Sequence, residues 1–191
     1  MSDMLINFSS LEKTKIVKPT HRKKKSAKNI SSVDTESKLD SKGIVEALTI
    51  RFINHKYLIN NAYIYEWESD FFSVSESGYI YEFEIKISRG DFKDDFNKIN
   101  KHQLLESTDP KTVLKKPNKF FYAVPRGLLT STVIPEYAGL LEIDPITKSV
   151  STIKEAPFLH KEKGFESLKD ILIDKFYFRY RDLLGKSKDY L

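Results

Sequence analysis

Asp70, Glu84 and Lys86 are of the types, and at the spacing, that metal-assisted phosphodiester hydrolysis requires. Glu84 and Lys86 follow Asp70 within sixteen residues and flank Ile85. Two carboxylates held close together repel each other unless a cation lies between them. Mg²⁺ or Mn²⁺ suits such an all-oxygen site, because it binds few protein ligands and keeps several waters. The metal would polarise a phosphate and activate a water, while Lys86 would orient that water or stabilise the developing negative charge.

A predicted strand over residues 79–87 presents two of these side chains together. Side chains alternate between the faces of a strand, so Glu84 and Lys86 share one face. The opposite face carries Phe83 and Ile85 and is apolar enough to cover a core. A Glu-x-Lys pair on a strand is also typical of an ordinary solvated face, and the sequence leaves that alternative open.

A predicted hairpin brings the third residue to the pair. Segment 64–74 is followed by Ser75–Gly78, whose residue types favour a tight turn with a positive φ at the glycine. The segment should then run antiparallel to strand 79–87. This pairing predicts that Asp70 and Glu84 lie close together across the two strands.

The run Glu84–Asp95 (EIKISRGDFKDD) resembles the strand-to-helix segment of the MmcB-like DNA-repair family, which belongs to the PD-(D/E)XK nuclease superfamily. The resemblance continues in Lys119–Pro125 (KFFYAVP) and Ile134–Ile143 (IPEYAGLLEI), and it covers roughly residues 60–145. One departure is that the family's usual Arg-Ala-Asp is Glu68–Asp70 (ESD) here, so the arginine is absent.

The resemblance implies a metal site and its ligands. Asp70 and Glu84 would bind Mg²⁺ or Mn²⁺ together with the backbone carbonyl of Ile85, and Lys86 would be the catalytic lysine. In members of the superfamily a glutamate on the first helix often completes the site. Glu46 is the only acid in the predicted helix 43–53, so it is the candidate; an ordinary solvent-facing glutamate is the alternative.

Basic residues that could bind nucleic acid follow the strand. The periodicity predicts one helix over Arg89–Glu106, on which Lys98 and His102 are four residues apart and share a face. The loop 108–118 holds a further basic cluster. The candidates for contact with a phosphate backbone in this part of the chain are Lys98, Lys101, His102, Lys115 and Lys116. A solvated basic face is the alternative for the helix.

The net charge of +5 is concentrated in a tail over residues 1–40. This tail is polar, rich in Ser and Lys and without periodicity, so we expect it to be mostly disordered. Its densest basic run is Arg22, Lys23, Lys24 and Lys25, which could bind DNA non-specifically. A solubilising or targeting tail is the alternative. A single nuclease-like domain is expected over residues 41–191.

The expected elements give an α/β fold. A helix capped by Ser41 comes first, and further strands are expected at 120–124 and in a hairpin of 137–143 with 149–153. A last helix is expected over 165–184. The order helix, strand, strand, strand, helix, strand matches a PD-(D/E)XK, restriction-endonuclease-like core, in which helices flank a mixed central sheet.

Composition narrows the classes of function. The chain has 191 residues and no cysteine, which excludes disulfides and thiolate metal sites and fits a reducing compartment. It has no run of eighteen apolar residues and no secretory signal, so we expect no membrane partner and a cytoplasmic location in a bacterial or phage-like host cell. No phosphate-binding glycine loop, zinc-ligand spacing or Gly-x-Ser-x-Gly elbow occurs.

The sequence therefore predicts a metal-dependent DNA nuclease that acts in DNA repair or processing. A catalytically inactive DNA-binding or scaffold protein on the same fold is the first alternative. A restriction-type endonuclease is the second, although no base-reading element can be identified. Any processive action would depend on a protein partner, because no helicase or ATPase motif is present.

Overall fold

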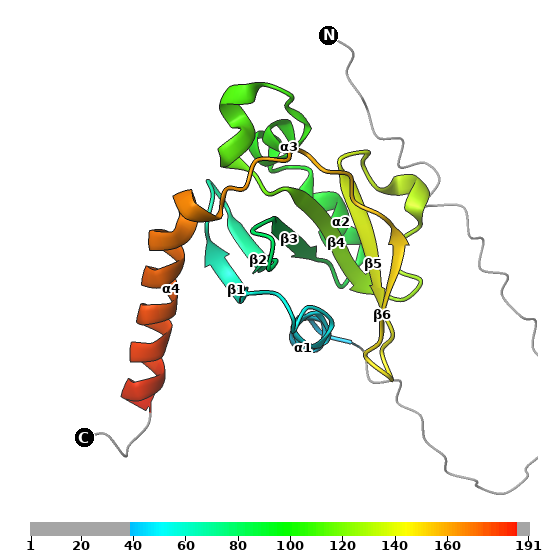
Figure 1. Cartoon of the computed structure of the whole chain (residues 1–191). Coiled ribbons are helices and arrows are strands. Elements are labelled where there is room, and N and C mark those ends of the chain that lie inside the picture. Colours follow the sequence, from blue (N-terminus) through cyan, green and yellow to red (C-terminus); the bar gives the residue numbers. More distant parts are fainter. Residues whose placement is uncertain (1–38, 187–191) are drawn as a thin grey trace, which may run out of the picture. The chain divides into compact units, whose positions relative to one another are not determined.

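The computed structural model describes residues 39–186, which form a six-stranded sheet and four α-helices (Figure 1). The helices are α1 (Ser41–Arg51), α2 (Arg89–Asp95), α3 (Ile99–Glu106) and α4 (Phe165–Lys186), with 3-10 helices η2 (Pro110–Lys115) and η3 (Ser131–Val133). The strands are β1 (Tyr57–Tyr63), β2 (Glu68–Val74), β3 (Ile80–Ile85), β4 (Lys119–Pro125), β5 (Ala138–Ile143) and β6 (Val150–Lys154). The predicted tail over residues 1–40 lies almost wholly outside the described residues.

The sheet is mixed, and its strands lie in chain order from β1 to β6. β2 is antiparallel to both of its neighbours, β1 and β3; β3, β4 and β5 are parallel, and β6 is antiparallel to β5. The connection from β3 to β4 contains α2 and α3, as a crossover between parallel strands requires. The predicted α/β class, with helices flanking a mixed sheet, is confirmed.

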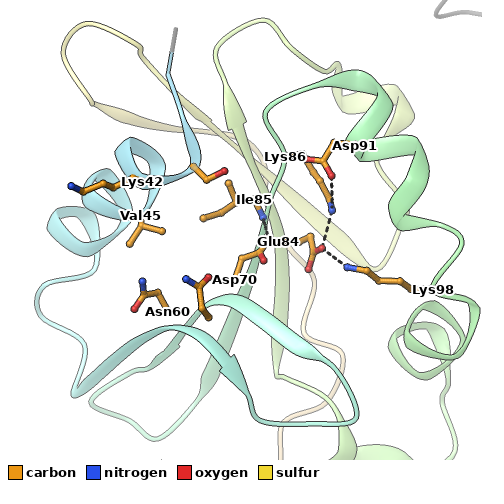
Figure 2. A pocket seen from close by; sticks show the side chains of 11 residues that line it. Lys42, Val45, Asn60, Asp70, Glu84, Ile85, Lys86, Asp91 and Lys98 are labelled. Atoms are coloured by element: carbon orange, nitrogen blue, oxygen red, sulfur yellow. Dashed lines mark hydrogen bonds and ion pairs between the residues drawn. The ribbon is translucent and has the colours of Figure 1, made fainter. Parts of the chain in front are cut away.

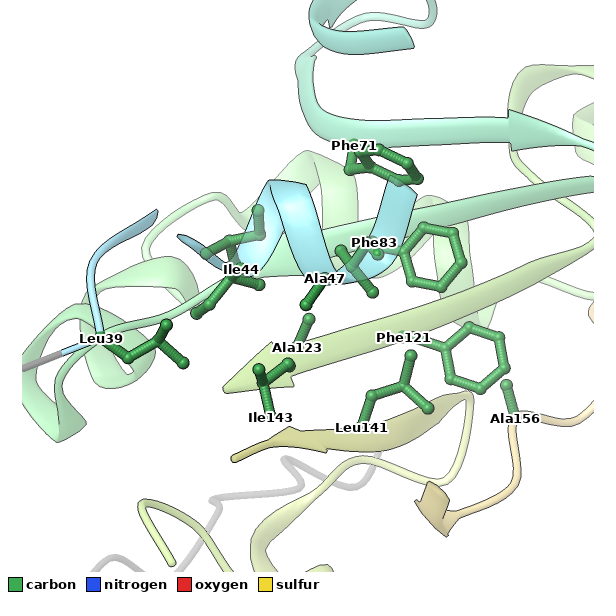
Figure 3. Packing of buried hydrophobic residues seen from close by; sticks show 12 residues of the cluster. Leu39, Ile44, Ala47, Phe71, Phe83, Phe121, Ala123, Leu141, Ile143 and Ala156 are labelled. Carbon is green, nitrogen blue, oxygen red and sulfur yellow. The ribbon is translucent and has the colours of Figure 1, made fainter. Parts of the chain in front are cut away.

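Helix α1 covers one face of the sheet. Its N-cap is Asp40, whose Oδ1 accepts a hydrogen bond from the N–H of Gly43 at 2.8 Å, so the predicted cap at Ser41 is one residue late. Ile44 and Leu48 are fully buried and belong to the same core cluster as Phe83 and residues of β4 and β5 (Figure 3).

The opposite face of the same strands is covered in two parts. Phe92 of α2 and Leu105 of α3 pack on β4 and β5. Phe165, Leu168 and Leu172 of α4 pack on β1, β2 and β3. The strand register places both contacts on one face, because successive partners across the sheet carry alternating side chains to the same side.

The hairpin prediction is confirmed, and the strand before it was missed. β2 and β3 are antiparallel and joined by a turn in which Gly78 has a φ of 85°. The predicted strand 64–74 starts only at Glu68, and residues 57–63 form the separate edge strand β1. Asn60 and Asn61 interrupt β1 with residue types that are depleted in strands, which hides it from pattern analysis.

The prediction of one helix over Arg89–Glu106 is wrong, because the chain turns between α2 and α3. The N–H of Lys98 donates to the carbonyl of Asp95 at 2.9 Å, a tight three-residue bond that ends α2. The same carbonyl accepts from Nε2 of His102 at 2.9 Å. In a continuous helix this carbonyl would accept from the N–H of Ile99. The hydrogen bonds from Lys98 and His102 replace that one helical bond and stabilise the break.

Candidate active site

The candidate site opens where β2 and β3 separate. The two strands pair only as far as Phe71 and Phe83; past this point β2 pairs with β1 and β3 pairs with β4. Oδ2 of Asp70 accepts a hydrogen bond from the N–H of Ile85 at 2.7 Å. The side chain thus satisfies a backbone donor that the ladder no longer pairs, and it holds the carboxylate at the opening.

Glu84 lies beside this opening and is surrounded by three ammonium groups (Figure 2 shows two of them). Its Oε1 is 2.9 Å from Nζ of Lys86 and 2.9 Å from Nζ of Lys98. Its Oε2 is 2.5 Å from Nζ of Lys101. Glu84, Lys86 and Lys101 are buried, whereas about half of the Lys98 side chain is exposed. Such a buried charge cluster is stable only because every charge is paired.

Asp95 holds the same three lysines from the other side. Its Oδ1 is 3.3 Å from Nζ of Lys86, 3.0 Å from Nζ of Lys98 and 3.8 Å from Nζ of Lys101. Burial would raise the pKa of the Asp95 carboxyl, but the hydrogen bond from His102 and the charges of the lysines hold it well below its usual value. Asp95 is therefore a permanent anion that fixes the lysines around Glu84.

Two tyrosines and a histidine support Asp95 from behind. The hydroxyl of Tyr122 donates to Oδ2 of Asp95 at 3.0 Å, and Nδ1 of His102 is 2.5 Å from the hydroxyl of Tyr137. Since Nε2 of His102 faces the Asp95 carbonyl, it carries the proton, and Nδ1 accepts from Tyr137. Burial raises the pKa of both tyrosines, so they remain neutral donors.

Lys86 supplies charge and cannot act as a base at neutral pH. Burial alone would lower its pKa, but the carboxylates of Glu84 and Asp95 outweigh burial and raise it. A third carboxylate, Asp91, lies 3.5 Å from the same ammonium and is partly exposed. Lys86 therefore stays protonated at the end of β3.

Burial raises the pKa of Asp70 to about 6, and the nearby charge of Glu84 adds to the shift. Glu82 lies two residues before Glu84 on β3. It is fully buried, and its Oε1 accepts a hydrogen bond from Nε1 of Trp67 at 2.6 Å. Burial raises its pKa to about 7. At both positions burial outweighs the contacts that favour the ionised form, and an added cation would favour the ionised form of Asp70.

A pocket of about 540 Å³ opens beside these groups, and Asp70, Glu84, Lys86 and Lys98 are among the residues that line it. Asp70 and Ile85 lie at its centre, Glu84, Lys86 and Lys98 form one side, and α1 forms the other (Figure 2). The remaining residues of the lining are Ser41, Lys42, Val45, Asn60, Asn61 and Asp91. Anionic and cationic groups thus face one solvent-accessible space.

The donor chemistry of the pocket fits Mg²⁺ or Mn²⁺ on one condition. The carboxylates of Asp70 and Glu84 and the backbone at Ile85 offer only oxygen ligands, and Mg²⁺ is commonly held by one or two carboxylates plus water and substrate phosphate. Within residues 39–186, no three His, Asp or Glu side chains gather as a metal-holding group. Since both oxygens of Glu84 contact lysines, a metal ion must displace at least one ammonium, and exposed Lys98 is the one free to move.

Several predicted site residues lie elsewhere. Glu46 is exposed on α1 and does not line the pocket. Lys115 is exposed on η2. Lys116 is buried, and its Nζ donates to the carbonyls of Leu105 and Ser107, so its charge stabilises the C-terminal end of α3 instead of facing a ligand.

The predicted basic face of residues 98–102 is divided by the helix break. Lys101 and His102 are buried in the Glu84–Asp95 network, and only Lys98 also faces solvent. A face composed of all three residues is therefore not available to nucleic acid. The basic run Arg22, Lys23, Lys24 and Lys25 lies outside the described residues.

Sequence analysis missed the pocket residues contributed by β1 and α1. Asn61 has a φ of 44° and lines the pocket beside Asn60, and Lys42 lines it from α1. An Asn-Asn pair within a strand is a usable signal, because asparagine is enriched at positive φ. No sequence pattern marks Lys42 as a pocket residue, because a lysine in the first turn of a helix is common.

No helix of the described residues is long and apolar enough to cross a membrane. No family model matches the chain, and no curated protein matches it significantly. Among solved structures, the chain is similar to a protein of unknown function from Silicibacter pomeroyi, with a TM-score of 0.52 and 19% sequence identity. The match covers 76% of this chain and 88% of that chain. At this identity the likeness shows the fold alone.

Proposed function

We propose that this protein is a metal-dependent nuclease that hydrolyses phosphodiester bonds in DNA, built on a PD-(D/E)XK core. The observation that carries the proposal is the shared pocket at which β2 and β3 separate. Asp70, Glu84 and Lys86 line it together, from two strands, as the spacing of these residues predicts. A sheet opening that presents two carboxylates and a lysine has the groups for in-line attack of water on a phosphate.

The residues would divide the work as follows. Asp70 and Glu84, with the carbonyl of Ile85, would hold Mg²⁺ or Mn²⁺, which supplies a Lewis acid and a water of lowered pKa when bound. Lys86, protonated and fixed by Glu84 and Asp95, would stabilise negative charge on the phosphate. Lys98 would leave Glu84 for a phosphate oxygen of the substrate, because it is the half-exposed lysine of the three.

The proposal extends to the MmcB-like family, whose resemblance rests on a run that contains two acids beside Lys86. Asp91 and Asp95 both contact the ammonium of Lys86, so the sequence Glu84–Asp95 joins a catalytic lysine to the helix that positions it. Ser88 caps this helix by accepting from the N–H of Asp91 at 3.1 Å. The specific family therefore remains part of the proposal, together with a role in DNA repair.

One observation favours a second candidate, a DNA-binding or scaffold protein that does not cut. Both oxygens of Glu84 contact ammonium groups, and Lys101 is too buried to leave without repacking α3. If these contacts persist in solution with metal present, the site has only Asp70 as a free carboxylate. The pocket would then bind phosphate through Lys98 and Lys42 without activating water.

The proposal is tested with labelled single-stranded, duplex and branched DNA in Mg²⁺ or Mn²⁺. Wild type is compared with Glu84→Gln and Lys86→Met, which keep the size of the side chains. Glu76→Gln and Lys161→Met are matched controls, because both residues are exposed and lie outside the pocket. Far-UV circular dichroism of each variant checks that the fold is kept.

Metal-dependent cleavage that falls at least a hundredfold in both site variants, with both controls active, supports the nuclease. Cleavage that is equally strong in Glu84→Gln would mean that a contaminating enzyme or another site is responsible. DNA binding without cleavage in any metal, unchanged in Glu84→Gln, would favour the scaffold.

A further inference from the structure

Helix α4 exposes an unusual amount of apolar surface for a helix of a small domain. Only Phe165, Leu168 and Leu172 are buried among its 22 residues. More than half of each residue is exposed at Ile173, Tyr177, Phe178, Tyr180 and Leu183. Contiguous apolar surface of this kind is typical of a site for protein association.

Ile173, Tyr177 and Tyr180 form a stripe distinct from the face that packs on the sheet, whereas Phe178 and Leu183 lie beside it on the helix. Leu168 and Leu172 pack toward β1, and two turns beyond Leu172 the guanidinium of Arg179 donates to Oδ1 of Asn60 in β1 at 2.7 Å. Helix α4 lies beside β1 in Figure 1. The stripe consists of the exposed residues Ile173, Tyr177 and Tyr180 together with the partly buried Leu184. At 3.6 residues per turn it lies roughly 100° around the helix from the packed face.

The stripe has the spacing of a coiled-coil seam. Its residues are separated by four, three and four positions, which is the alternation of d and a positions in a heptad. Ile173 and Tyr180 then occupy d positions, and Tyr177 occupies an a position. This spacing predicts that the partner on this face is another helix.

We propose that the partner is α4 of a second copy of this chain, paired in antiparallel orientation. Asp174 and Arg181 both follow a d residue of the stripe directly, so they occupy the two e positions on the same flank. In an antiparallel pair, e positions face each other. Asp174 of each copy therefore faces Arg181 of the other, and the two-fold symmetry makes two ion pairs from one self-complementary surface.

The size of the stripe agrees with a reversible dimer. A buried aromatic side chain covers roughly 150–250 Å², so the half-exposed residues of the stripe and Leu183 offer roughly 500 Å² of apolar area. The flanking charged residues bring this near the roughly 800 Å² per partner of a standard interface. The tyrosines suit such a surface, since their hydroxyl groups stay hydrated when the dimer dissociates.

Charge substitutions on the full chain test the pairing by sedimentation velocity across a range of protein concentrations. Wild type should change from monomer to dimer as its concentration rises. Asp174→Arg and Arg181→Asp should each weaken the dimer at least tenfold, because each places like charges opposite each other. Mixing the two variants in equal amounts should restore a dimer. Asp182→Arg is the matched control, since Asp182 is exposed on the side of α4 away from the stripe.

Each outcome decides the proposal. Restored association in the mixture, with Asp182→Arg unaffected, supports an antiparallel α4 pair whether or not the protein cuts DNA. A chain that stays monomeric at every concentration overturns it. A dimer that is equally strong in all variants also overturns it, because the interface would lie elsewhere. Binding of a monomeric chain to phosphatidylserine vesicles, lost in Tyr177→Asp, would assign the stripe to a lipid surface instead.

Discussion

The Glu84 cluster and helix α4 depart from the usual burial of residues in opposite ways, because one buries charged side chains and the other exposes apolar ones. At Glu84, five charged side chains are removed wholly or partly from water; on α4, large apolar side chains remain in it. Burying charge lowers stability unless every group is paired, and exposing apolar surface favours association. The two proposals therefore assign different ligands to the two regions: a phosphate and a cation to the Glu84 cluster, and another helix to α4.

One strand connects the two regions. One face of β3 contacts both α4 and the Glu84 cluster. On this face Ile80 packs against α4, and Glu82 and Glu84 follow at intervals of two residues toward α3. Lys86 completes the series just past the end of the strand. The same alternation that builds an apolar core at one end of the strand thus concentrates charge at the other. Substitutions in each region can therefore be compared on a common scaffold.

The largest effect is expected where charge is buried. Lys101→Met should lower the free energy of unfolding by about 4 kcal/mol, because it leaves the buried Oε2 of Glu84 without its partner. Urea unfolding at pH 7.5 measures the change. The double variant Glu84→Gln/Lys101→Met should recover about half of the loss, since the uncompensated charge is gone.

The matched control for Lys101 lies on α4. Lys169 is half exposed and its Nζ is 3.8 Å from Oε2 of Glu166, so Lys169→Met should change stability by less than about 0.5 kcal/mol. Equal effects of Lys101→Met and Lys169→Met would show that the lysines around Glu84 are solvated in solution.

The next effect separates the two faces of α4. Leu172→Ala should lower the free energy of unfolding by about 3 kcal/mol, because Leu172 is buried against the sheet. Ile173→Ala, one position along, should change it by less than about 0.5 kcal/mol at concentrations where the chain is monomeric. Thermal unfolding of both variants at low concentration measures the difference. A comparable loss in Ile173→Ala would mean that the stripe packs on this chain's own sheet.

The central hairpin and the site residues on it could be predicted from sequence because their signals are local. Gly78 marks the turn, and alternation on strand 79–87 places Glu84 toward the site. The break between α2 and α3 could not be predicted, since its cause is the contact of His102 with the Asp95 carbonyl. That contact also buries His102, which periodicity alone placed on an open basic face.

Long-range contacts account for the other differences. Lys116 looks like a surface lysine in sequence, and only the folded chain reveals the two carbonyls that its ammonium binds. The backbone carbonyl of Asn60 accepts a hydrogen bond from Arg179, which is 119 residues away in sequence. The sequence predicts a last helix over 165–184 but does not show which of its apolar faces packs on the sheet. Partner choice between equivalent apolar faces depends on the tertiary fold.

A smaller effect, with a distinct pH dependence, is expected at Asp70. A carboxyl whose pKa is raised on folding, here to about 6, stabilises the fold fully below its unfolded value near 4, and this contribution is lost as the pH rises through 6. Asp70→Asn removes the penalty and keeps an oxygen for the N–H of Ile85. The variant should be about 2 kcal/mol more stable than wild type at pH 8 without metal and about equal at pH 4, as measured by urea unfolding. Metal-dependent cleavage by wild type should decline below pH 6, because the protonated carboxyl cannot bind the ion. A stability gain at pH 4 as large as at pH 8 would contradict the assignment.

A small stability change and a measurable change in metal affinity should come from Lys98, where the buried cluster meets solvent. Its ammonium lies 2.9 Å from Glu84 and competes with any cation for that carboxylate. Because the side chain is half exposed, Lys98→Met should cost at most about 1 kcal/mol of stability.

Removing one positive charge about 5 Å from a dication in a water-rich site should tighten Mn²⁺ binding about tenfold. Electron paramagnetic resonance of free Mn²⁺ measures this affinity without relying on catalysis, and Lys161→Met serves as the control. Unchanged Mn²⁺ affinity in Lys98→Met would mean that the ion does not bind at Glu84. The buried charge cluster would then stabilise the fold and would not be a metal site.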